Sequence, residues 1–292
     1  NSVLGAGEDL HYKIIYTNKS DKGLEDAVLS AQLAGDMFDF STLKTNGIIS
    51  LSGNSVVWNK ITNLELGAIG IGGSGVVNFD IKTKNNYPIK RLSDKNFILK
   101  INSRIEAGVA GASSSIVGAD KLENKIKGKV GLATKVYFRD AASGILNKGT
   151  VPPAVGVSTD YTVHWVITNY ATDISDLNLQ AVLGDYVKYT GVSKTAINTD
   201  VVYNSINNTV SWHVDKISAT RGLVDKPIEL IFQIEATPSA AQAGSALPLI
   251  GLTTLTAKDD FTGMALVASS EGSTSILKDD TTVGVSDGAV IQ

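Results

Sequence analysis

The chain of 292 residues has no cysteine, only three histidines and no surplus of positive charge. The lack of cysteine excludes disulfides, thiolate nucleophiles and cysteine-ligated metals. Lys and Arg number 26 against 29 Asp and Glu, a net charge of -3, so we expect no nucleic-acid partner. No run of about 18 apolar residues occurs, so we expect no membrane span in this chain.

What is present is the composition of a folded protein, with 43% hydrophobic and 19% charged residues. This length predicts two domains. The chain begins at Asn1, without an initiator methionine, a basic segment or an apolar leader. That start is expected of a mature or excised fragment of a longer protein.

Alternation of apolar and polar residues dominates the sequence. It is clearest at residues 11–18, 75–82 and 161–167, which are rich in β-branched and aromatic side chains. Turn dipeptides such as Asn46-Gly47 separate these segments. The best helical candidate, residues 120–129, has no clear apolar stripe. The sequence therefore predicts an all-β fold class with about seven short strands in each half.

The two halves share a spaced set of residues, which indicates an internal repeat. A Thr-Asn pair ends a strand in each half, a Val-x-Trp segment follows, and then a Phe-x-Ile segment. We place one domain at residues 1–129 and the second at 130–292, with 130–138 as its first strand. The matching positions are Thr17-Asn18 and Thr168-Asn169, Trp58 and Trp212, and Phe79 and Phe232, at offsets of 151 to 154 residues.

The pattern resembles a known repeat family. Residues 161–169, Val210-Ser211-Trp212, 257–263 and 279–284 are similar to the conserved-repeat family called "domain of unknown function 11", closest to repeats in surface proteins of ultrasmall candidate-phyla bacteria. The similarity is good over about 130–285 and looser over 5–110. It implies two tandem Ig-like antiparallel β-sandwich domains at an extracellular bacterial or archaeal cell surface, and it carries no catalytic residues.

Two short motifs suggest enzymes, and neither has the context that its chemistry needs. Gly70, Gly72 and Gly75 satisfy the spacing of a dinucleotide-binding loop, but a strand-like segment follows where that motif requires a helix. Residues 284–288 satisfy a nucleophile elbow, but no helix is expected after Ser286 and no histidine lies downstream. We therefore expect no enzymatic activity.

The tryptophans and histidines allow a structural and a functional interpretation. Trp58 and Trp212 could form a sugar-stacking platform, but at a repeated strand position they are expected to be core anchors. His164 and His213 neighbour Trp165 and Trp212 and lie on the opposite strand faces. If the tryptophans are buried, both histidines are expected to face solvent.

Paired aspartates suggest calcium. Asp259 and Asp260, and also Asp279-Asp280, lie in expected loops, where several carboxylate oxygens could bind Ca²⁺. The alternative is solvated turn residues. Asp259 and Asp260 are the candidate metal ligands, and no other cofactor is expected. A Lys–Asn isopeptide bond would need a buried lysine, and the sequence names no partner for the strand lysines Lys13 and Lys135.

The sequence thus favours a non-enzymatic structural segment of a bacterial cell-surface protein: a filament, surface-layer or stalk subunit. Its partners would be other copies of itself or adjoining repeats of the same protein, with strand exchange through residues 1–7 or 283–292. The alternative is an adhesin that recognises a host or cell-wall glycan, or a protein on another cell. Aromatic residues are only 7% and lie mostly on expected strands, which favours the structural role.

Overall fold

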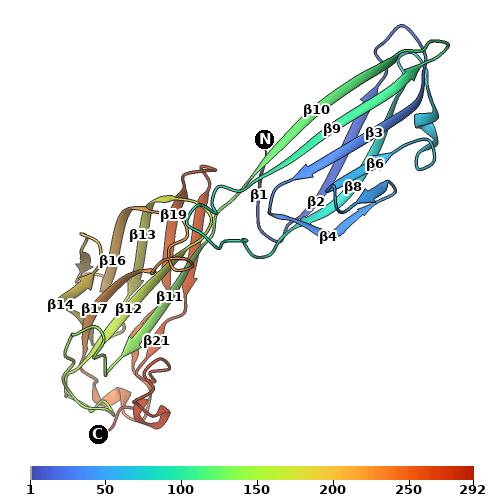
Figure 1. Ribbon diagram of the computed structural model, residues 1–292. Coiled ribbons are helices and arrows are strands. Elements are labelled where there is room, and N and C mark those ends of the chain that lie inside the picture. The colour runs from blue at the N-terminus through green and yellow to red at the C-terminus, as the bar shows by residue number, and fades with distance from the viewer. Residues whose placement is uncertain (1) are drawn as a thin grey trace. The chain divides into compact units, whose positions relative to one another are not determined.

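A computed structural model describes residues 2–292 and shows an all-β chain, which confirms the predicted fold class (Figure 1). The chain forms two compact β-sandwich units. Unit 1 contains the residues up to Pro88 together with Asn96–Lys127, and unit 2 contains Ile89–Lys95 and Gly128–Gln292. Within the described residues, helix is limited to three 3-10 turns, and none is long and apolar enough to cross a membrane.

Unit 1 packs a sheet in the order β1-β10-β9-β3-β6-β5, with β7 also paired to β3, against a sheet in the order β2-β8-β4. All pairings are antiparallel except that of β1 with β10. The strands are β1 Val3–Leu4, β2 Asp9–Thr17, β3 Leu24–Ala34, β4 Phe38–Thr45, β5 Ile48–Ser50, β6 Ser55–Trp58, β7 Ala68–Ile69, β8 Ser74–Thr83, β9 Ile98–Val109 and β10 Ser115–Ile126, with the 3-10 turn η1 at Leu64–Gly67.

Unit 2 packs a sheet in the order β11-β12-β17-β14 against one in the order β15-β16-β13-β19-β20, with a small β18-β21 pair beside them. The strands are β11 Val130–Tyr137, β12 Thr159–Asn169, β13 Ile174–Val182, β14 Val187–Thr195, β15 Val201–Asn204, β16 Thr209–Ile217, β17 Ile228–Ala236, β18 Pro248–Ile250, β19 Thr253–Asp259, β20 Ala265–Ser270 and β21 Ser273–Thr274, with 3-10 turns η2 at Ala240–Gln242 and η3 at Val285–Gly288.

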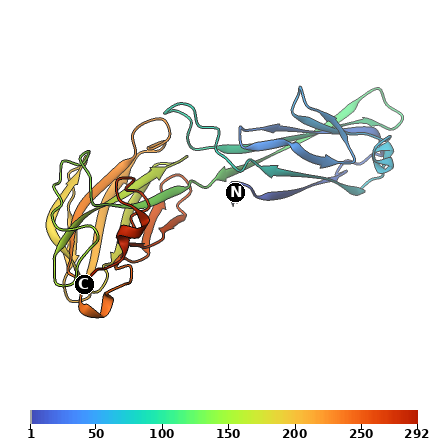
Figure 2. The ribbon, with the colours of Figure 1, turned by 90° about the horizontal axis from the view of Figure 1, so that it is seen from below.

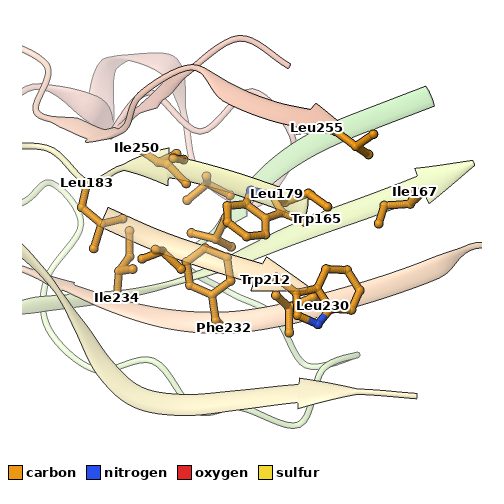
Figure 3. Packing of buried hydrophobic residues seen from close by; sticks show 14 of the residues in the cluster. Trp165, Ile167, Leu179, Leu183, Trp212, Leu230, Phe232, Ile234, Ile250 and Leu255 are labelled. Atoms are coloured by element: carbon orange, nitrogen blue, oxygen red, sulfur yellow. The ribbon is translucent and has the colours of Figure 1, made fainter. Parts of the chain in front are cut away.

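The core of each unit follows from the alternation in its strands. In β13, every second side chain from Leu177 onward is buried while its neighbours are exposed, as expected for a strand with one face on the core. Figure 3 shows the result in unit 2, where Trp165 and Phe232 from one sheet meet Leu179 and Trp212 from the other. Burial of such large apolar side chains is the main stabilising contribution to each sandwich.

The segment with the best helical pattern, residues 120–129, is strand for most of its length. Residues up to Ile126 belong to β10, which pairs with β9 over eleven consecutive positions. Pairing with a neighbouring strand outweighs a weak local helix preference, because strand formation depends strongly on tertiary context.

Both termini pair within their own units. Val3 and Leu4 lie parallel to Lys125 and Ile126 in β10. In unit 2 the C-terminal segment lies against the sandwich, as Figure 2 shows, and Ile291 is bridged to Ala154. Val3, Leu4 and Ile291, from the two segments expected to pair with a neighbouring molecule, are therefore already paired within the chain. Asn1 lies outside the described residues.

Candidate functional site

The two predicted calcium ligands lie at the end of β19. Asp259 is fully buried, and its carboxylate accepts hydrogen bonds from three backbone N–H groups. Oδ1 accepts from Phe261 at 2.9 Å and from Thr262 at 3.1 Å, and Oδ2 accepts from Gly128 at 2.8 Å. The side chain therefore holds the β19–β20 turn and the start of unit 2 together.

Asp260 has different partners. Its Oδ1 accepts from the Ser175 hydroxyl at 2.6 Å, and its Oδ2 lies 3.6 Å from Lys216 Nζ. Nowhere in residues 2–292 do three or more His, Asp or Glu side chains form a group that could hold a metal ion. The assignment of calcium to Asp259 and Asp260 stays a prediction.

The second acidic pair is divided between solvent and interior. Asp279 is exposed, whereas Asp280 is buried and accepts from the backbone N–H groups of Phe138 at 3.0 Å, Arg139 at 2.8 Å and Thr282 at 3.0 Å. Burial alone would raise the pKa of Asp280, but the hydrogen bonds from Thr282, Arg139 and Phe138 outweigh it and lower the pKa. This carboxylate fastens the C-terminal segment to the end of β11.

A buried histidine between two carboxylates is the principal polar cluster that the sequence did not reveal. His164 Nε2 lies 2.7 Å from Asp140 Oδ2, and Nδ1 lies 2.7 Å from Glu229 Oε1. A carboxylate oxygen accepts hydrogen bonds, so a ring nitrogen of His164 that carries a proton has an acceptor on either side of the imidazole. The Tyr137 ring packs edge-on against this imidazole, with 5.0 Å between ring centroids.

The expectation that His164 faces solvent is wrong, since the residue is only 8% exposed. It does lie on the strand face opposite Trp165, but Asp140 and the segment after β11 cover that face. Burial raises the pKa of Asp140, and hydrogen bonds from His164, Ser143 and Thr162 more than offset that increase, so that the pKa is lowered overall. His213 is exposed as expected, with half of its side chain in solvent.

The tryptophans that match between the halves are core residues. Trp58 and Trp212 are at most 1% exposed, so neither presents a face on which a sugar could stack. Each indole N–H finds an acceptor in a loop of its own unit: Asn46 Oδ1 at 3.0 Å and Thr199 Oγ1 at 2.8 Å. A buried indole N–H usually has such a partner, and the polar residues in these two loops supply it.

The Thr-Asn pairs have an equally specific role. Asn18 Nδ2 donates to the carbonyls of Lys22, Ile69 and Gly70 within 3.1 Å. Asn169 Nδ2 donates to three carbonyls in unit 2, those of Thr172, Ile217 and Ser218, at 2.8, 3.3 and 2.9 Å. Each amide satisfies carbonyls at the end of a strand and in the adjoining loops.

The remaining motifs have structural explanations. Gly70 and Gly72 form the turn between β7 and β8, and the strand β8 follows them, as the sequence predicted. Ser286 lies in the 3-10 turn η3, and its hydroxyl donates to Asp287. Lys13 is exposed and Lys135 half-buried, so neither has the burial that isopeptide chemistry requires.

No family model and no curated protein matches the chain. Among solved structures it is similar to the C-terminal domain of the Streptococcus pyogenes antigen I/II-family protein AspA, at 12% identity and a TM-score of 0.34, over 92% of this chain and 94% of that one. It is also similar to the major pilin subunit BcpA of Bacillus cereus, at 10% identity and a TM-score of 0.34, over 91% and 69%. A third similarity is to the major pilin SpaD of Corynebacterium diphtheriae, at 8% identity and a TM-score of 0.33, over 86% and 59%.

Proposed function

We propose that the chain is a non-enzymatic structural segment of an extracellular cell-surface protein, built from Ig-like repeats of the kind that the Thr-Asn, Trp and Phe-x-Ile pattern resembles. The observation that carries the proposal is the use of its polar side chains. Asp259, Asp280 and Asn169 all bind backbone groups of their own sandwich. Aspartate and asparagine side chains often take part in catalysis or ligand binding, but in this chain they hold loops in place.

The duplication of these contacts supports the same function. The Trp58 and Trp212 indoles and the Asn18 and Asn169 amides make equivalent hydrogen bonds in the two units. The two sandwiches thus have separate cores and the same internal hydrogen bonds. Such units are typical of a segment that is repeated along a chain to give length and resistance to unfolding.

Cell labelling tests the location. Antibodies raised against the purified chain should label intact cells of the organism that makes it, and brief protease treatment of intact cells should remove the label. Antibodies against a cytoplasmic protein serve as the control and should label only permeabilised cells. Labelling of this chain only after permeabilisation would refute the proposed location.

Pulling single molecules tests the structural role. With handles at both termini, we expect two separate unfolding events that release roughly 40 and 60 nm of chain, from the sizes of units 1 and 2 and about 3.6 Å per extended residue. A single event, or gradual extension without peaks, would contradict two independently stable load-bearing units.

A further inference from the structure

Two asparagines of the chain have the spacing of an N-glycosylation acceptor, which is an asparagine with a serine or threonine two positions later and no proline between them. One is Asn18, followed by Ser20, and the other is Asn207, followed by Thr209. Because a motif this short also arises by chance, the surroundings of each side chain decide which of the two can accept a sugar. The two asparagines differ in burial and in hydrogen bonding.

Asn18 has no room for a sugar in the folded chain. Its side chain is 4% exposed, and its Nδ2 donates to three carbonyls of unit 1. The Ser20 hydroxyl, the second part of the motif, donates to Asn18 Oδ1 at 2.7 Å. A sugar on Nδ2 would replace the hydrogen bonds to the carbonyls and separate the loops that they join.

Asn207 is in the opposite situation, in the turn at residues 205–208 that joins β15 to β16. The residue is exposed, and its side-chain amide makes no hydrogen bond to the part of the chain that the structure describes. Within the same part, the Thr209 hydroxyl donates only to the backbone carbonyl of Asn207 itself, at 3.3 Å. Both groups of the motif therefore lie next to each other, and neither holds a distant part of the fold.

The neighbouring Asn208 holds this turn in place. Its Nδ2 donates to the carbonyls of Gly184 at 3.1 Å and Val187 at 3.0 Å, and its Oδ1 accepts from the Tyr203 hydroxyl at 2.7 Å. Its φ of 53° is the left-handed conformation that tight turns use and that asparagine tolerates. Asn208 thus makes the hydrogen bonds that fix the turn, and the side chain of Asn207 is left to solvent.

The surface beside Asn207 is an uncharged, apolar sheet edge. Ile206 is 96% exposed and Val202 is 64% exposed. Val202 belongs to β15, which is the last strand of its sheet and pairs with β16 alone among the described strands. Residues 201–208 contain no charged side chain. Exposed apolar edge strands promote association, and natural proteins charge or cover them. A hydrated sugar on Asn207 would cover this one.

We propose that Asn207 is a glycosylation site, to which a transferase attaches an oligosaccharide from a lipid-linked diphosphate donor. Nδ2 of Asn207 attacks the anomeric carbon of the donor sugar. The new N–C bond replaces the C–O bond to the diphosphate, which leaves with the electron pair, and the amide gives one proton to a base of the transferase. The inference rests on the proposed extracellular location, because this modification is found on surface loops of secreted proteins.

Peptide mapping of the chain purified from the organism that makes it tests the proposal. Cleavage after lysine and arginine releases residues 195–216 as one peptide, in which electron-transfer fragmentation locates the sugar. We expect the sugar on Asn207 and none on Asn204, which is exposed but has isoleucine two positions later. Asn18 should be unmodified, and a sugar there would contradict the argument from burial. An unmodified Asn207 would overturn the proposal.

Variants of the chain expressed in the same organism test the role of the motif. Thr209→Val removes the hydroxyl and should abolish the glycosylated peptide, whereas Thr209→Ser keeps the hydroxyl and should retain it. Equal glycosylation of Thr209→Val and the parent chain would refute attachment through this motif. Cell labelling separates this inference from the proposed function. A chain that labels on intact cells but has an unmodified Asn207 refutes the glycosylation alone, whereas labelling only after permeabilisation refutes the proposed location.

Discussion

Replacing Asn169 by alanine tests whether the Thr-Asn pair stabilises its sandwich. The side chain is fully buried, and its amide donates to the carbonyls of Thr172, Ile217 and Ser218. Alanine has no amide, so these three carbonyls lose the N–H groups that donate to them. A buried polar group left unsatisfied costs about 1–3 kcal/mol. Two N–H groups serve the three carbonyls, so we expect unit 2 to lose about 3 kcal/mol of its free energy of unfolding.

Urea unfolding followed by tryptophan fluorescence measures this loss. A Trp58→Phe background leaves Trp165 and Trp212 as the fluorescent reporters, and both belong to unit 2. With a denaturant slope of about 2 kcal/mol per molar urea, a loss of about 3 kcal/mol lowers the midpoint by about 1.5 M. The Asn178→Ala variant is the control, because Asn178 is exposed and the midpoint should hardly change.

A shift below about 0.5 M for Asn169→Ala, or one equal to that of Asn178→Ala, would refute the reasoning. It would mean that water or a rearranged loop satisfies the three carbonyls. The matching change in unit 1, Asn18→Ala, should leave the transition of unit 2 in place, because Asn18 hydrogen-bonds only within unit 1.

Three further changes test the other polar contacts. The pKa of Asp280 is lowered in the folded chain, so the ionised carboxylate stabilises unit 2 fully above the ordinary pKa of 3.8. This stabilisation is lost as the pH falls through the pKa of the folded chain. The melting temperature of unit 2 should therefore fall in acid, and it should fall less steeply in Asp280→Asn. A melting curve of Asp280→Asn as steep in acid as that of the parent would contradict this. Thr199→Val removes the acceptor of the Trp212 indole and should destabilise unit 2 by about 1–2 kcal/mol in urea unfolding; no change would show that the hydrogen bond contributes nothing. Asp259→Asn should lower the melting temperature in chelator as well as in calcium, because the carboxylate accepts three backbone N–H groups. The calcium hypothesis requires a different result: calcium should raise the melting temperature of the parent chain but not that of Asp259→Asn.

The strands could be predicted because their signal is local. In β13 and β8, alternate side chains on one face are apolar, and the pattern is visible in any short window of sequence. The core positions of Trp58 and Trp212 followed from their matching strand positions in the two halves.

The polar contacts could not be predicted in the same way. Whether His164 faces water depends on a segment that folds over it from Asp140, 24 residues earlier, and alternation reports only the side of the strand. The role of Asp259 depends on Gly128, which lies 131 residues away in the chain.

The interruption of unit 1 by residues 89–95 has a consequence for synthesis. Lys95, in this segment, forms an ion pair with Asp173 of unit 2, and it is translated before β9 and β10 of unit 1. Since β9 lies between β3 and β10, a nascent chain that stops before residue 98 leaves β3 with an unpaired edge. Such edges promote aggregation. The first sandwich can close only after residue 126 has left the ribosome, and by then part of the second has already been made.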